Sequence, residues 1–336
     1  MKTVSIVIPC RNEEKYIAKC LDSILAQDYD VSKISVYVCD GKSTDGTAAI
    51  VNEYALKHPT IILLINEKQT TPFALNLGIK ASTADVSIIL GAHSELYPDY
   101  VSNCIAAFAH GDLIGCTGGI IENVYENEVA EVIGKAMSSG FGVGNAHFRT
   151  GDKDGYVDTV AFGAYKKEVF EKAGFFDEEL IRNQDDEFNF RVIRHNFAIY
   201  LARNIRSKYY VRAAFDKLFK QYYQYGYWKV YVNKKHRTVT TTRQLVPLAF
   251  VLFLLIGFIS SFFSPVFLYL FLAGLVAYML LSAYSAAKIS SGIKQTFQVM
   301  KAFFILHFSY GSGYLQGIID FFIFQKQIKK EEVLTR

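Results

Sequence analysis

The sequence TVSIVIP at residues 3–9 is rich in β-branched side chains and predicts a buried β-strand that begins the fold. Asn12, followed by Glu13 and Glu14, then opens an amphipathic helix that extends to about Ala26. Further strand patterns at 34–39, 61–65 and 86–90 alternate with helical patterns at 47–57 and 72–81. This alternation predicts an α/β fold with a mostly parallel, doubly wound sheet, in which ligands lie beyond the carboxyl ends of the strands.

Polar side chains gather where three of the predicted strands end, at 11–13, 40–45 and 93–95. The carboxylate of Asp40 precedes a Gly-containing turn, so it can accept hydrogen bonds from ribose hydroxyls or a base edge. The first amides of the next helix would then face phosphate. The alternative is a plain turn in which Asp45 caps that helix. Neither GxGxxG nor GxxxxGKS occurs, so the pattern favours neither a dinucleotide motif nor a P-loop.

An acidic cluster, NQDDEFNFR at residues 183–191, lies in otherwise apolar sequence. Carboxylates repel one another and are costly to desolvate, so such a cluster needs a reason. One reason is chemical, because a carboxylate at the mouth of a pocket can take a proton from an attacking hydroxyl. The alternative is an acidic first turn that stabilises a helix running through Arg191, and both interpretations can hold together.

The composition indicates a membrane-associated protein with a cytosolic part. Of the 336 residues 51% are hydrophobic, the mean hydropathy is +0.16, and the net charge of only +4 does not indicate a nucleic-acid partner. The five cysteines are odd in number and lack CxxC spacing, which favours reduced thiols over a disulfide framework or a zinc site. No signal peptide is expected, because Met1 leads directly into a strand pattern.

The second half of the chain carries the membrane signals. Aromatic and basic residues alternate between about 215 and 236, which favours a helix lying on a membrane over an ordinary amphipathic surface helix. Residues 245–263 and 265–287 are each apolar and long enough to span a bilayer. Lysines and arginines lie before and after this pair, so the positive-inside tendency places both flanks in the cytoplasm, with a hairpin between.

A third apolar stretch, at about 302–324, is interrupted by polar residues and is expected to be interfacial or re-entrant. The alternative is a third crossing, which would place Lys326, Lys329 and Lys330 outside. The expected division is therefore a catalytic domain at 1–212, an interface segment at 213–243 and a membrane region at 244–336.

Three phrases together resemble the family 2 glycosyltransferases of the GT-A fold: SIVIPCRNE from Ser5, DGKSTDGT from Asp40, and the acidic cluster. The resemblance covers about residues 1–202. Longer phrases are similar to the exopolysaccharide transferases related to the succinoglycan ExoA protein; they are GFGVGNA from Gly140, VDTVAFG from Val157, NQDDE from Asn183 and KQYYQYGYWK from Lys220.

The resemblance implies a nucleotide-sugar site. Family members bind the donor with residues that correspond here to Pro9, Asn12, Glu13 and Asp40. Their metal-binding DxD motif is replaced by Gly91-Ala92-His93, which would still lie against the donor. His93 is then either a ligand of a divalent cation or simply a polar loop residue. Imidazole suits Mn²⁺, whereas Mg²⁺ prefers oxygen ligands.

The resemblance also implies a base and an acceptor site. The family's ED motif falls on Gln184-Asp185, so Asp185 is the expected base, with Asp186 as its rival. A QxxRW motif has a near match from Gln224 to Trp228, with tyrosine in place of the arginine. Trp228 would either stack on an acceptor sugar or anchor the chain in the membrane interface.

The expected protein is thus an inverting glycosyltransferase at the inner face of the cell membrane, with its catalytic domain in the cytoplasm. It would move a sugar from a nucleotide-sugar, expected to be a UDP-sugar, to a polyprenyl-phosphate-linked saccharide in the synthesis of exopolysaccharide or another cell-surface polysaccharide. One alternative is an inactive GT-A scaffold within an assembly complex. Another is a processive synthase, although two firm spans argue against a polymer channel built by one chain.

Overall fold

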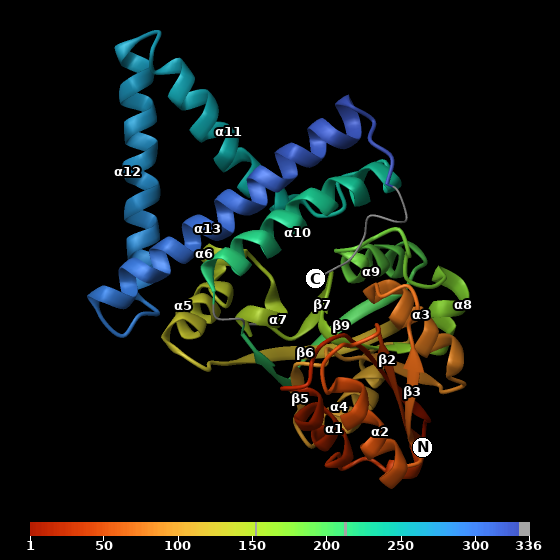
Figure 1. Cartoon of the computed structure of the whole chain (residues 1–336). Helices are drawn as coiled ribbons and strands as arrows, with labels where there is room; N and C mark the ends of the chain where they lie inside the picture. Colours follow the sequence, from red (N-terminus) through yellow and green to blue (C-terminus); the bar gives the residue numbers. More distant parts are fainter. Residues whose placement is uncertain (152, 212–213, 329–336) are drawn as a thin grey trace. The chain divides into compact units, whose positions relative to one another are not determined.

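The computed structural model describes residues 1–151, 153–211 and 214–328 (Figure 1). The chain divides into two compact units, and within the described residues each unit consists of two segments. Unit 1 contains Met1–Asn123 and His147–Tyr210, and unit 2 contains Val124–Ala146 and Val211–Ile328. Lys329 and Lys330, which belong to the predicted basic tail, lie outside the described residues, as do residues 212–213 at the expected domain boundary.

The sheet of unit 1 begins with the predicted parallel strands. They are β1 (Val4–Cys10), β2 (Ile34–Asp40), β3 (Ile61–Ile65) and β4 (Val86–Ile89). β1 pairs in parallel with β2 and β4, and β2 pairs in parallel with β3. In this register Cys10 lies opposite Asp40 and Asp40 lies opposite Ile65, so these strands end together at one edge of the sheet, the carboxyl edge.

The second half of the sheet is largely antiparallel. Its strands are β5 (Ser94–Leu96), β6 (Ile114–Val124), β7 (Gly155–Val157), β8 (Ala161–Lys166) and β9 (Ala198–Tyr210). The order across the sheet is β3-β2-β1-β4-β8-β6-β9-β5, with β7 paired to β9. β8 runs antiparallel to both β4 and β6, so β8 starts at the carboxyl edge where β4 ends.

Helices cover both faces of this sheet (Figure 1). α1 (Ile17–Leu25), α2 (Thr47–Lys57) and α4 (Tyr100–Ala107) pack on the face that carries Ile6 and Ile8. α3 (Thr71–Ala81), α8 (Lys167–Ala173) and α9 (Gln184–Arg194) pack on the face that carries Val7 and Cys39. Short helical turns complete the unit: Val31–Lys33, Phe108–His110 and α7 (His147–Thr150).

Unit 2 is helical. Its elements are α5 (Glu128–Met137), α6 (Gly140–Val143), α10 (Phe215–His236), the turn Thr242–Gln244, α11 (Leu245–Ser260), α12 (Pro265–Ala287), α13 (Ile293–Ile318) and the π-helical turn Ile319–Ile323. α10 and α13 lie very close together, because a β-carbon on Gly226 would come within 2.0 Å of the Tyr310 carbonyl oxygen and one on Gly313 within 2.0 Å of the Tyr223 oxygen. The apolar residues at 302–317 are therefore explained by packing of α13 against α10, without contact with a membrane.

In the part of the chain that the structure describes, two helices are long and apolar enough to cross a membrane, Thr242–Ser260 and Pro265–Ala287. In each helix only 6% of the apolar segment is buried inside the protein, so its side chains are available to lipid. The second helix has the predicted bounds, whereas the first ends at Ser260, and residues up to Ser264 form the turn between them. The interfacial position of α10 and of the stretch 302–324 stays a prediction.

Candidate functional site

Two loops at the carboxyl edge are tied together by hydrogen bonds. Asn12, with φ at 55°, donates its backbone N–H to Ser43 Oγ at 2.8 Å and accepts from Thr44 N at 2.8 Å through its side-chain oxygen. Glu13 N donates to Thr47 Oγ1 at 2.8 Å. These bonds keep residues 13–16 in the loop, and α1 therefore starts later than the sequence predicts. Half-buried Pro9, opposite Cys39 in the sheet, lies just before this loop.

Asp40 is 2% exposed, and its carboxylate organises the turn that follows. Its two oxygens accept from Ser43, one from the backbone N–H at 3.0 Å and the other from the hydroxyl. Asp45 accepts from Thr47 N at 3.0 Å, as the turn interpretation expects. The turn and the nucleotide interpretations are compatible, because Oδ2 accepts only the Ser43 N–H among the described residues and keeps a second lone pair, whereas Oδ1 also accepts from Cys10 Sγ at 3.7 Å.

The loop after β4 brings Gly91 and His93 to the same edge. His93 Nδ1 lies 3.6 Å from Glu13 Oε1, and its ring meets Tyr209 edge-on with centroids 5.1 Å apart. Within the described ranges, no three His, Cys, Asp or Glu side chains gather closely enough to hold a metal ion by themselves. Glu13 and His93 nevertheless supply one carboxylate oxygen and one imidazole nitrogen, a donor set that suits Mn²⁺ as part of a larger coordination shell.

The acidic cluster forms the first turn of α9, and Asp185 is exposed there. One turn further on, buried Asn189 accepts from Tyr165 Oη at 2.8 Å and donates to Thr159 Oγ1 at 3.0 Å. Burial raises the pKa of the Tyr165 phenol well above its usual range, and the charges of Cys116 and Asp185 nearby add to that rise. Asp185 precedes Asn189 by one helical turn, so it lies on the same side of α9 as Asn189, the side that faces β8.

The direction of α9 places its first turn at the carboxyl edge. After the helix, Ala198 N donates to Leu113 O at 2.7 Å, so β9 starts beside the start of β6, at the opposite edge of the sheet. α9 consequently runs from the carboxyl edge back across the face that carries Cys39. Side chains alternate between the two faces along β2, so the side chain of Asp40 lies on the same face as those of Val36 and Val38. This face is opposite to the one that α9 covers. The structure thus brings Asp40 and Asp185 to one edge of the sheet from opposite faces.

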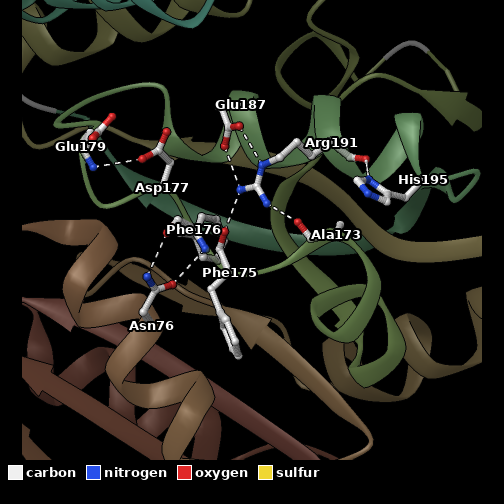
Figure 2. Close-up of polar contacts among 9 residues, drawn as sticks. All are labelled: Asn76, Ala173, Phe175, Phe176, Asp177, Glu179, Glu187, Arg191 and His195. Atoms are coloured by element: carbon white, nitrogen blue, oxygen red, sulfur yellow. Dashed lines mark hydrogen bonds and ion pairs between the residues drawn. The ribbon is translucent and has the colours of Figure 1, made fainter. Parts of the chain in front are cut away.

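A buried ion pair fixes α9 (Figure 2). Glu187 is 1% exposed and accepts from Arg191 Nε at 2.7 Å and Nη2 at 2.9 Å. The same guanidinium donates to the carbonyl oxygens of Ala173 and, at 2.7 Å, of Phe175. The sequence analysis did not predict that Glu187 has a structural role while Asp185 is exposed. The i,i+4 spacing of Glu187 and Arg191 could have indicated the ion pair.

Asp186 lies beside the expected base but is half-buried, and its N–H donates to Asp185 Oδ1 at 2.9 Å. The expected acceptor residues belong to unit 2. Gln224 is half-buried on α10, and Trp228 is 7% exposed and packs near Phe321 with ring centroids 6.3 Å apart. Tyr227, which replaces the motif's arginine, donates its hydroxyl to Asp320 Oδ2 at 2.8 Å.

Comparison with known proteins identifies relatives of this arrangement. The family model described as glycosyl transferase family 2 matches residues 5–174. The chain is 36% identical over 234 residues to the dolichyl N-acetyl-alpha-D-glucosaminyl phosphate 3-beta-D-2,3-diacetamido-2,3-dideoxy-beta-D-glucuronosyltransferase of Methanococcus voltae, covering 67% of this chain and 72% of that protein. It is 28% identical to the succinoglycan biosynthesis protein ExoA of Rhizobium meliloti, covering 73% of this chain and 74% of ExoA.

Solved structures share the fold. The mannosyltransferase PcManGT of Pyrobaculum calidifontis, solved with GDP-Man and Mn²⁺, superposes with a TM-score of 0.58 at 18% identity and covers 92% of this chain and 87% of its own. S. aureus TarS 1–349, solved with UDP, superposes with a TM-score of 0.50 at 18% identity, and the match spans 67% of this chain and 64% of the TarS chain. These likenesses confirm the GT-A fold.

Proposed function

This chain belongs to glycosyl transferase family 2, and from this premise we propose that it transfers a sugar from a nucleotide-sugar to a lipid-linked saccharide, with inversion at the anomeric carbon. The proposal rests on one observation: Asp40 and Asp185 lie at the same edge of the sheet, on opposite faces. A donor held by residues of one face can then meet an acceptor hydroxyl activated from the other.

The donor would lie against the loops at the ends of β1, β2 and β4. Asp40 is the candidate partner of the ribose or base, with Pro9, Asn12 and Glu13 beside it and the loop from Gly91 to His93 across from it. The loop after β1 and the turn after β2 are joined by hydrogen bonds, so they hold these groups rigidly. This rigidity favours binding of a fixed nucleotide conformation. UDP is the nucleotide we propose, and its presence in the TarS structure supports that choice.

Asp185 would act as the general base. Its exposed carboxylate takes the proton of the acceptor hydroxyl while that oxygen forms a bond to the anomeric carbon. The bond from that carbon to the donor diphosphate breaks on the opposite side, and the nucleoside diphosphate leaves with the bonding electron pair. A divalent cation, when bound, would offset the charge that grows on this leaving group.

The acceptor would be a saccharide on a polyprenyl phosphate at a membrane surface. The relative from Methanococcus voltae is named for a dolichyl phosphate-linked acceptor, and the two apolar helices of unit 2 supply a matching membrane attachment. In this proposal residues 1–212 hold the catalytic domain, 213–243 lie at the interface and 244–336 form the membrane region. The catalytic domain faces the cytoplasm.

A donor screen tests this function. Purified full-length protein in detergent is mixed with UDP- and GDP-sugars, with and without Mn²⁺, and nucleotide release is measured with and without polyprenyl-phosphate saccharides. Acceptor-dependent release of UDP is the expected result. Tight nucleotide binding without release, for every donor and acceptor pair, would instead favour the inactive scaffold.

A further inference from the structure

Arg149 is a cationic side chain to which the proposed function assigns no role. It lies on α7 in unit 1 (Figure 1). Its guanidinium nitrogen Nη1 is buried and has no hydrogen-bond partner among the described residues. Buried polar atoms are normally paired, and an unpaired buried charge is costly. The missing partner of Nη1 therefore indicates an anionic ligand that comes from outside the chain.

Two aromatic rings hold this guanidinium in place. Its central carbon lies 5.3 Å from the centroid of the Phe148 ring and 6.0 Å from that of Tyr209. The Tyr209 ring meets His93 edge-on, with centroids 5.1 Å apart, so Arg149 lies one ring away from the loop after β4. A guanidinium that stacks on aromatic faces can still donate the N–H groups at its edge.

The guanidinium lies on the face of the sheet that α9 covers. Tyr210 points to the other face, because its ring centroid lies 5.0 Å from that of Tyr16, at the start of α1. Side chains alternate along β9, so Tyr209 faces the side of α9. Phe148 packs against the hydrophobic cluster of that same side. The guanidinium is therefore near the carboxyl edge, on the face where Asp185 lies.

We propose that Arg149 binds a phosphate group of a substrate, with two guanidinium N–H groups, one of them on Nη1, donating to two phosphate oxygens. The planar fork of arginine matches phosphate in this two-armed geometry. This inference rests on the proposed function, which brings two phosphate-bearing molecules to this edge, the donor with its diphosphate and the acceptor with its lipid phosphate. On the diphosphate, the fixed positive charge of Arg149 would stabilise the negative charge that grows as the nucleotide leaves.

The test compares ligands with and without phosphate. The dissociation constants of UDP and of uridine are measured for full-length wild type, Arg149→Ala and Arg149→Lys in detergent. If the diphosphate is the partner, Arg149→Ala is expected to weaken UDP binding by about tenfold or more, the scale of a hydrogen bond to a charged group, and to leave uridine binding unchanged. Arg149→Lys keeps the charge without the fork and is expected to lose less. If the lipid phosphate is the partner, UDP binding is retained and the KM for the polyprenyl-phosphate saccharide rises by a similar factor.

Arg194→Ala is the matched control, because Arg194 is exposed at the far end of α9 and also lies over a ring, 5.9 Å from the centroid of Phe190. It is expected to bind UDP and transfer sugar as the wild type does, and an unchanged Tm shows that each variant folds. Wild-type UDP affinity, acceptor KM and kcat in Arg149→Ala would overturn the proposal, as would an equal loss of UDP and uridine affinity.

The same samples separate this inference from the proposed function. A wild type that transfers sugar, together with an Arg149→Ala variant that does so equally well, refutes the phosphate site alone. A wild type that neither binds nor releases a nucleotide refutes the function.

Discussion

Arg191 Nε lies 2.7 Å from Glu187 Oε1, and the two residues form a two-armed ion pair across one turn of α9 (Figure 2). The Glu187 side chain is 2% exposed and that of Arg191 is 18% exposed, so water screens the pair only weakly. Two of the remaining guanidinium donors reach backbone carbonyls just after α8. Lysine cannot reproduce this fork of donors.

Arg191→Lys is therefore expected to destabilise unit 1 by about 1–3 kcal/mol, the scale of buried hydrogen-bond acceptors left without a donor, because lysine keeps the charge but not the planar set of donors. The measurement is chemical unfolding of full-length protein in detergent, followed by a probe of unit 1. Arg194→Lys, on the exposed side of the same helix, is the matched control and should change stability little. Equal stability of both variants would show that the fork does not hold α9.

Asp185→Asn is expected to lower transfer by about 10²- to 10⁴-fold, because the amide cannot accept the proton of the acceptor hydroxyl. UDP binding should be largely retained, since the base touches the acceptor rather than the nucleotide. Asp186→Asn distinguishes the rival, and Asp112→Asn, at an exposed position after α4, is the control. Transfer at the wild-type rate by Asp185→Asn would refute the assignment of the base.

Gly313→Ala is expected to destabilise unit 2 by about 1–3 kcal/mol, because its β-carbon would meet the Tyr223 carbonyl oxygen at 2.0 Å and force α10 and α13 apart. Gly292→Ala is the matched control, since no atom lies within 4 Å of a β-carbon there and its φ of 169° suits any residue. Thermal unfolding in one detergent compares the two. A Tm for Gly313→Ala equal to that of the control would contradict the close packing of these helices.

The double variant Leu270→Lys with Val276→Lys is expected to release the chain from membranes on a carbonate wash. Each lysine near the middle of a spanning helix costs about 2.5–3.5 kcal/mol on insertion scales. Leu56→Lys with Leu113→Lys is the control, because these leucines are 89% and 66% exposed in unit 1. If the α12 variant stays in the pellet as firmly as the control, α12 does not span the bilayer.

Local patterns predicted much of this fold. The β-branched run at 3–9 and the helix at Pro265–Ala287 depend on neighbouring residues in the sequence, and both appear with nearly the predicted bounds. Contacts between distant segments were not predictable in this way. α1 begins at Ile17 because loop residues bond to the β2–α2 turn, and the ring of Phe162 faces Gly91 across 71 positions of sequence.

The candidate site was predictable to a similar degree. The order of the motifs indicated Asp40 and Asp185 as its members, and alternation of strands and helices explains why both lie at one edge. The structural role of Glu187 follows from its burial. The sequence alone could not distinguish it from Asp185, an exposed residue of the same charge in the same cluster. The membership of Val124–Ala146 in the helical unit follows from packing of α5 on α13, as in the 2.9 Å bond from Lys135 Nζ to Gln295 Oε1.

The path of the chain has a practical consequence for anyone who wishes to produce the catalytic part alone. Because Val124–Ala146 leaves the sheet unit and returns to it, no single cut yields either unit intact. A truncation after residue 210 would keep α5 but remove α13, leaving the apolar stripe of Val132, Ile133 and Met137 without its cover. A soluble fragment therefore requires a short linker in place of this excursion, in addition to removal of the hydrophobic tail.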